Sequence, residues 1–370
     1  MRANSVRLKG AWAGGAWRKS SFLEGKSAWL KGQSTWLKAA AGSFALAWAC
    51  APKPAPSEPR TETALPQDGN ARPPAARSSS QRQGSTAPPP IVPNTNLLPG
   101  SAAPRPCGEL GCVEFSSAEA ALTDLLRTEP RVLALGEIHA PKSQTAVPST
   151  ATRFGELLPL FAGRSKDLVI ELLLSSGQCG AVEKQVETKT APIREPQAAS
   201  NQNEFVELGF RAKALGIQPR ALTVACKDYA RVAGAGSSDI DQLLALIGAR
   251  VEEEVTALLP KRSTGTILVY GGALHNDLHP RPGRERWSFG PSLAQATNGA
   301  YAELDLVVPE YVADNDTFRA QVWYSRLPAR PLADAPPEPP VFRLLQPAPR
   351  SYVLIFPWTT PHPTAARPAP

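Results

Sequence analysis

The sequence predicts an α/β protein with a mostly parallel central sheet, helices on both faces and late antiparallel strands. Three observations lead to this fold class. Short, continuously apolar runs alternate with segments of helical spacing, as expected for parallel strands joined by helical crossovers. The centre of the chain is poor in proline, since 27 of the 39 prolines lie in residues 51–106 and 328–370. The last apolar segments follow one another with no helix between them.

Proline content and charge divide the chain into four parts. Residues 1–50 form a basic leader, and residues 51–106 form a tether rich in Pro, Ala and Ser that we expect to be disordered. Residues 107–327 form the α/β domain, which is long enough to bury one core. Residues 328–370 form a proline-rich extension, with room for one or two added strands.

The strands of the predicted sheet are short apolar runs bounded by polar or turn-forming residues. Four of them alternate with helices and are expected to pair in parallel. Four later segments, expected to extend the sheet or add antiparallel strands, have no helices between them. The first four cover residues 131–136, 167–174, 221–225 and 266–270, and the later ones residues 301–308, 318–325, 341–345 and 352–356.

The helices are predicted from capping residues and apolar spacing. Ser116 or Ser117 caps a helix that runs to Leu126. Gly216 supplies a C-terminal stop for a helix over residues 204–215. Residues 175–203 are expected to be a long polar insertion. Two further helices are predicted over residues 153–161 and 239–259.

The leader has the order of charges typical of a secretory signal. Lys31 and Lys38 precede the uncharged residues 39–49, which are too few to span a membrane permanently. Ala49 and Cys50 then resemble a bacterial lipobox. We expect an exported protein of the cell envelope that is anchored to a membrane by a lipid on Cys50. Plain secretion is the alternative.

The net charge of +7 does not indicate a nucleic-acid partner. Residues 1–50 carry eight Lys or Arg and one Glu, so the remaining 320 residues contain 32 basic and 32 acidic residues. A neutral domain without a visible basic stripe lacks the electrostatic attraction that nucleic-acid binding requires.

Cysteine content fits an oxidising compartment. With Cys50 lipidated, four cysteines remain, which allow three disulfide pairings that the sequence does not distinguish. We adopt the pairing of Cys107 with Cys112 and of Cys179 with Cys226. Four buried thiols are the alternative.

Two predicted strands end in the same pattern, Gly-x-x-His. Glu137 and His139 follow the first strand, and His275 follows the fourth. Ligands of open α/β sheets bind outside the carboxyl ends of the strands, so both histidines are placed where a site is expected. A third strand carries Glu171 within an apolar run, where a carboxylate needs a partner.

These four residues are predicted to share one site. His139, His275 and Glu171 could bind a divalent metal, while Glu137, His139 and His275 could perform acid–base catalysis. Structural roles for the histidines are the alternative. Lys227, Asp228 and Glu310 also lie near strand ends and could join the cluster, whereas His279 and His362 are expected to be solvated.

The order of these motifs resembles the ChaN and Tiki-type superfamily, which includes erythromycin esterase-like and TraB-like proteins. The resemblance rests on residues 133–139, 168–171 and 268–275 and covers about residues 131–310. ChaN-like members imply a lipoprotein that binds haem and serves iron uptake. Tiki-type members imply a metal-dependent protease, and esterase-like members imply hydrolysis with a histidine base.

The resemblance maps Glu137, His139 and His275 onto positions common to these branches, and Glu171 onto a frequent strand acid. Haem or a divalent metal ion is therefore the expected cofactor, with Glu137, His139, Glu171 and His275 around it. Three functions stay open: an envelope-tethered protein that binds haem or another iron or metal ligand, a metal-dependent or histidine-based hydrolase, and a non-catalytic envelope module. The sequence does not decide whether the protein is an enzyme, and it leaves the oligomeric state unknown.

Overall fold

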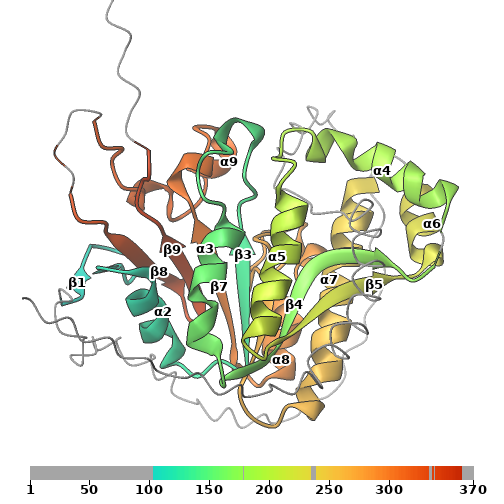
Figure 1. The fold of residues 1–370 in the computed structure, drawn as a ribbon, viewed down its shortest axis with the longest axis horizontal. Helices are drawn as coiled ribbons and strands as arrows, with labels where there is room; N and C mark the ends of the chain where they lie inside the picture. The colour runs from blue at the N-terminus through green and yellow to red at the C-terminus, as the bar shows by residue number, and fades with distance from the viewer. Residues whose placement is uncertain (1–102, 178, 235–238, 333–335, 337, 361–370) are drawn as a thin grey trace, which may run out of the picture. The chain divides into compact units, whose positions relative to one another are not determined.

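The computed structural model describes residues 103–177, 179–234, 239–332, 336 and 338–360 (Figure 1). The predicted lipidation site at Cys50 and the tail residue His362 lie outside the described residues. Within the described part of the chain, no helix has both the length and the apolar character needed to cross a membrane.

A nine-stranded mixed sheet forms the centre of the fold. The strand order is β1-β2-β8-β9-β7-β3-β6-β4-β5. The neighbouring strands β9, β7, β3, β6, β4 and β5 pair in parallel, whereas β1 pairs antiparallel with β2, β2 with β8 and β8 with β9. The strands are β1 (Arg105–Pro106), β2 (Val113–Phe115), β3 (Val132–Glu137), β4 (Ser165–Ser175), β5 (Gln218–Val224), β6 (Thr266–Gly272), β7 (Tyr301–Val307), β8 (Phe342–Ala348) and β9 (Ser351–Ile355). The predicted fold class is confirmed.

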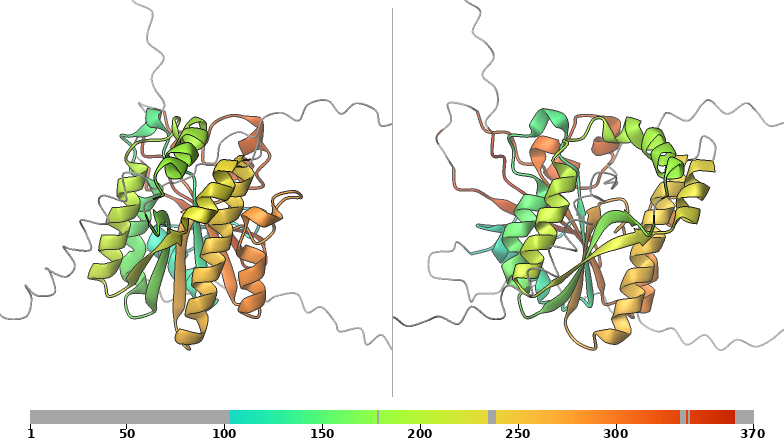
Figure 2. Two further views of the ribbon diagram at one scale, coloured as in Figure 1. Left: turned by 90° about the vertical axis from the view of Figure 1, so that its right-hand side faces the viewer. Right: turned by 45° about the vertical axis from the view of Figure 1, so that its right-hand side comes forward.

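Helices cover both faces of this sheet. α3 and α5 lie on one face and α7 and α8 on the other, as the two turned views make plain (Figure 2). α4 and α6 pack against each other near the ends of β4 and β5. The α-helices are α2 (Ala118–Leu126), α3 (Thr150–Leu157), α4 (Ala181–Arg194), α5 (Asn201–Ala214), α6 (Cys226–Gly234), α7 (Asp239–Leu258), α8 (Gly290–Ala296) and α9 (Asp316–Arg319).

Local sequence explains where several helices begin and end. The Ser117 hydroxyl accepts a hydrogen bond from the Ala120 amide at 3.1 Å and caps α2, as predicted. Gly216 has a φ of +77° and ends α5, a conformation that glycine adopts without steric cost. α7 buries its predicted apolar face, including Leu243, Ile247 and Val251, against strands β4 and β6.

Two predicted segments differ from the structure. Residues 175–203 were expected to form an insertion but contain α4, which buries only Val186, Thr190 and Ile193 on one narrow stripe. Residues 318–325 were expected to be a strand, but they begin in α9, continue through a turn and end in a 3-10 helix over Tyr324–Arg326. The Asn315 side chain starts α9 by accepting the Phe318 amide at 3.1 Å, and this cap outweighs the apolar content of the segment.

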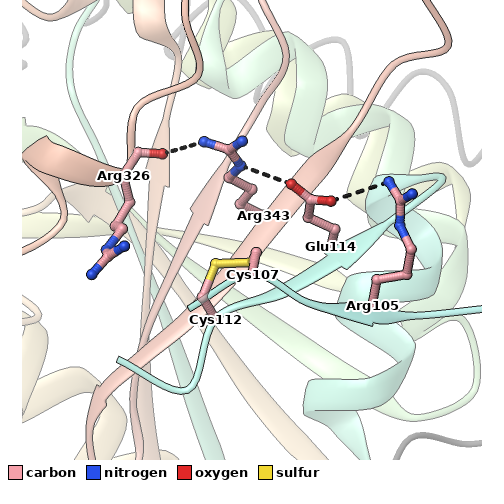
Figure 3. The surroundings of a disulfide bond; sticks show 6 residues. All are labelled: Arg105, Cys107, Cys112, Glu114, Arg326 and Arg343. Atoms are coloured by element: carbon pink, nitrogen blue, oxygen red, sulfur yellow. Dashed lines mark hydrogen bonds and ion pairs between the residues drawn. A yellow bond between two sulfur atoms is a disulfide. The ribbon is translucent and has the colours of Figure 1, made fainter. Parts of the chain in front are cut away.

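Both adopted disulfides are confirmed. Cys107 and Cys112 close the turn between β1 and β2, with Cα atoms 5.0 Å apart (Figure 3). Beside them Glu114 forms ion pairs with Arg105 and Arg343, each at 3.2 Å. Cys179 and Cys226 join the chain after β4 to the start of α6, with Cα atoms 5.1 Å apart. The second disulfide therefore ties together two segments that leave neighbouring strands.

Loss of the Cys179–Cys226 disulfide should destabilise the fold more than loss of Cys107–Cys112. The two bonds span 47 and 5 positions of sequence, respectively. Because a longer loop restricts the unfolded chain more, we expect losses of about 4 and about 2 kcal/mol. Urea unfolding of the two double Cys→Ser variants measures both, and an equal or reversed order would contradict the expectation.

Candidate functional site

The predicted site residues lie at the carboxyl ends of three adjacent strands. Glu137 is the last residue of β3, and His139 follows it by two positions. β6 lies between β3 and β4 and ends at Gly272, three residues before His275. Glu171 lies within β4. All four site side chains belong to residues that are no more than 6% exposed.

Glu137 orients His139. One oxygen of the Glu137 carboxylate contacts His139 Nδ1, and the other accepts a hydrogen bond from the Tyr270 hydroxyl. Nδ1 of a neutral His139 therefore carries the proton, because a carboxylate can only accept. Nε2 is then the basic nitrogen of the ring.

Aromatic rings enclose this pair. The Tyr270 ring stacks on Phe154 of α3 with ring centroids 5.2 Å apart, and it meets Phe205 of α5 edge to face at 5.5 Å. Phe205 also lies 5.9 Å from the His139 ring. Burial and the Glu137 charge raise the pKa of Tyr270 well above its usual value. Tyr270 thus stays protonated, and a hydrogen-bond donor to Glu137, at neutral pH.

A bulge in β4 aims Glu171 toward the site. β4 pairs with β6 as far as Ile170 opposite Tyr270, and its register with β5 shifts between Ile170 and Leu173. Such a bulge re-directs a side chain at the end of a ladder. One Glu171 oxygen then accepts the Gly272 amide at 2.7 Å.

Glu171 and His275 face each other. Glu171 Oε1 lies 3.7 Å from His275 Nε2 and is a buried oxygen with no hydrogen-bond partner. His275 Nδ1 lies 2.8 Å from the Trp287 carbonyl oxygen, so Nδ1 carries a proton and Nε2 faces the carboxyl. Lone pairs on both facing atoms would repel each other, and a proton on either atom would remove this repulsion.

Burial is the largest influence on the Glu171 carboxyl. It raises the pKa of Glu171, while the charges of His275 and His139 act in the opposite direction and that of Glu137 adds to the rise. Glu171 is therefore within electrostatic reach of the other three predicted residues, and its buried carboxyl releases a proton less readily than an exposed one.

The chain after β3 is fastened above this edge of the sheet. The Ala140 carbonyl accepts the Ala198 amide at 2.8 Å and the Asn201 side-chain amide at 3.2 Å. The Lys142 amide donates to the Pro196 carbonyl at 3.0 Å. These contacts fix the backbone that follows His139.

The motif glycines allow close packing around the site. A Cβ atom at position 271 would lie 2.8 Å from the Glu171 Cβ atom, and one at position 136 would lie 2.6 Å from Asn276 Oδ1. Both distances are shorter than side chains tolerate. Glycine is thus required by packing at Gly136 and Gly271.

A second acidic pair, absent from the sequence prediction, lies beside the site on β7. Buried Glu303 accepts hydrogen bonds from the Leu278 amide and the Ser351 hydroxyl, and Asp305 accepts one from Asn276 Nδ2 at 3.0 Å. The order of acidic and apolar residues along β7 could have signalled the pair, since Glu303 and Asp305 share one face of the strand. Burial is the main cause that raises the pKa of Glu303 to about 8 and of Asp305 to about 7.

Other residues suggested by the sequence stand outside this cluster of four. Asp228 is buried in α6 and pairs with Arg250 of α7 at 3.0 Å, so its role is to join two helices. Lys227 and His279 are exposed. Glu310 follows β7 and binds the segment after β9. A position near a strand end in the sequence was therefore not enough to distinguish residues of the site from these other residues.

The predicted metal site needs several ligating side chains close together. Among the described residues, no group of three or more His, Cys, Asp and Glu side chains could hold a metal ion. Each histidine has Nδ1 engaged by an oxygen, which leaves Nε2 as the nitrogen that could exchange a proton or bind a ligand. The metal ion expected from the sequence stays a prediction.

Comparison with known proteins returned no match. No family model, no curated protein and no solved structure matches this chain. The resemblance to the ChaN and Tiki-type superfamily therefore stays a prediction based on short motifs.

The buried β7 acids should make stability depend on pH. Their raised pKa values mean that the native state holds protons that unfolded carboxyls, with pKa values of about 4, release. The free energy of unfolding should therefore fall as the pH rises from about 5 to about 8. Urea unfolding across this range should show a smaller fall for Glu303→Gln than for wild type. The exposed Glu119→Gln serves as control and should keep the wild-type slope.

Gly271→Ala should destabilise the site by about 1–3 kcal/mol, because the new Cβ overlaps Glu171 near its own backbone. Gly234→Ala is the matched control, since a Cβ there meets no heavy atom within 4 Å. Thermal unfolding compares the two variants. A Gly271→Ala protein as stable as Gly234→Ala would show that the packing described for Glu171 is wrong.

Proposed function

We propose that the protein is a hydrolase that uses His139 as general base and the Glu171–His275 pair as proton donor, with carboxylic esters as the class of substrate. The observation that carries this proposal is the complementary state of the two histidines. His139 has a carboxylate partner on Nδ1, which makes its Nε2 basic, whereas His275 Nε2 faces the buried Glu171 carboxyl, whose pKa is raised by burial.

The first step is attack by water. His139 Nε2 removes a proton from a water molecule while the water oxygen bonds to the ester carbonyl carbon. Glu137 stabilises the imidazolium that forms, and the Tyr270 hydroxyl holds Glu137 in place. Carboxylate, histidine and reacting oxygen thus act in series, as in other histidine-based hydrolases.

The second step is departure of the alcohol. Negative charge on the carbonyl oxygen of the tetrahedral intermediate is stabilised by the proton of the Glu171–His275 pair. That proton passes to the leaving alkoxide as the carbon–oxygen bond breaks. The proton on His139 then restores the donor pair, so water and ester give acid and alcohol with no net change in the protein.

The metal-dependent and haem-binding functions have less support. No step is assigned to a metal ion because the described residues do not include a suitable ligand group. Haem binding stays a prediction of the family resemblance.

We also propose that the domain works in an oxidising compartment of the cell envelope. The two disulfides support this placement, because such bonds persist where thiols are not kept reduced. A lipid anchor on Cys50 remains part of the proposal.

His139→Gln should lower kcat/KM for p-nitrophenyl acetate at least 100-fold, since loss of a general base typically costs that much. Tyr270→Phe should lower it about tenfold by removing one hydrogen bond to Glu137. His279→Ala, which changes an exposed histidine, is the control and should behave as wild type.

Dialysis against EDTA tests the alternative within the same assay. The acid–base proposal expects unchanged hydrolysis, whereas a metal-dependent hydrolase would lose activity and regain it with added divalent ions. Folded His139→Gln and His275→Gln proteins that retain wild-type rates would sink the proposal.

A further inference from the structure

Two buried polar atoms near the candidate site have no hydrogen-bond partner. They are Nη2 of Arg153 and Oε2 of Glu310. Arg153 is 9% exposed and Glu310 is 7% exposed. A buried donor or acceptor without a partner costs free energy, so each atom is suited to receive one from a ligand.

Arg153 is fixed by contacts that leave Nη2 available. It lies in α3, where its Nε donates to the Pro148 carbonyl at 3.1 Å. The guanidinium also lies over the Phe356 ring, 5.0 Å from the ring centroid. Contacts at the edge and at the face of the guanidinium therefore hold the Arg153 side chain in place before any ligand binds.

Glu310 is fixed in a similar way. Its Oε1 accepts the backbone amides of Thr359 and Thr360 at 2.6 and 3.1 Å, together with the Thr359 hydroxyl at 2.8 Å. Three donors on one oxygen anchor the carboxylate, while Oε2 accepts none. The carboxylate orientation is thus set by the chain that follows β9.

The two side chains influence each other without forming an ion pair. Burial lowers the pKa of Arg153, and the Glu310 charge is the largest influence that opposes this. Burial raises the pKa of Tyr311, and the charges of Arg153, Glu137 and Glu310 also act on it, so Tyr311 is within electrostatic reach of both the unpartnered side chains and the candidate site. The Tyr311 hydroxyl donates to the Val147 carbonyl, in the chain that follows His139.

The charges select the chemistry of a ligand. Arg153 offers a donor and Glu310 an acceptor, so a ligand needs an acceptor and a donor of its own. An anion would be repelled by Glu310 and Glu156, and a cation by Arg153. An amide satisfies both atoms because its oxygen and its N–H are separate atoms held in one plane.

We propose that Arg153 and Glu310 form a subsite for an amide group, so that the substrate of the proposed hydrolase carries an amide close to the bond that is cleaved. The identity of this substrate class rests on the proposed function. The subsite itself does not, because an amide can bind there whether or not hydrolysis follows.

Two esters of equal chain length test the substrate class. N-acetylglycine p-nitrophenyl ester carries the amide, and p-nitrophenyl pentanoate does not. Arg153→Lys and Glu310→Gln should each lower kcat/KM about tenfold for the amide ester, because each changes one charged hydrogen-bonding group. The same variants should leave hydrolysis of the pentanoate within about twofold of wild type. Equal effects on both esters would overturn the proposal.

Binding of N-acetylglycinamide to the intact protein, followed by NMR, tests the subsite without turnover. Saturable shifts in wild type that are lost in Arg153→Lys support the subsite, even where neither ester is hydrolysed and the proposed function fails. Absence of shifts in wild type overturns it. Equal binding of 1-pentanol would show a general polar cavity instead of an amide subsite, and this also overturns it.

Discussion

The buried carboxyl group of Glu171 is the constraint to which the rest of the site conforms. A carboxylate in this position is unstable unless it is neutralised or hydrogen-bonded. The bulge in β4, the amide of Gly272 and the imidazole of His275 each meet part of that requirement. Gly271 lacks a side chain because the same carboxyl side chain fills the space next to it.

The opposite state of the two histidines follows from this constraint. Glu137 is bonded to a tyrosine hydroxyl and to His139, so its negative charge is well satisfied. Glu171 has one oxygen without a hydrogen-bond partner, and burial raises its pKa. In the proposed mechanism these surroundings give the two carboxyls different tasks, one to support a base and the other to hold an acid.

The sequence predicted the parts of the structure that depend on local pattern. Continuous apolar runs gave β3, β4, β5 and β6, and their order placed Glu137, His139, Glu171 and His275 at one edge of the sheet. α4 was missed because its buried stripe is only three residues wide, and α9 because a capping asparagine decides its start. The contribution of Tyr270 to the site was missed, because its hydroxyl contacts Glu137, which lies 133 positions earlier in the sequence.

The position of β9 determines the order in which the strands can join the sheet. β1 and β2 come first in the described sequence, yet they join the sheet only through β8, and β8 joins it only through β9. β1 and β2 therefore have no place in the sheet until β8 and β9 have joined it. Pairing over such long sequence separations is slow, because loop closure precedes any gain from the contacts. The antiparallel edge of the sheet thus forms only after residues 342–355 have paired with β7, and it is the part of the sheet expected to form last.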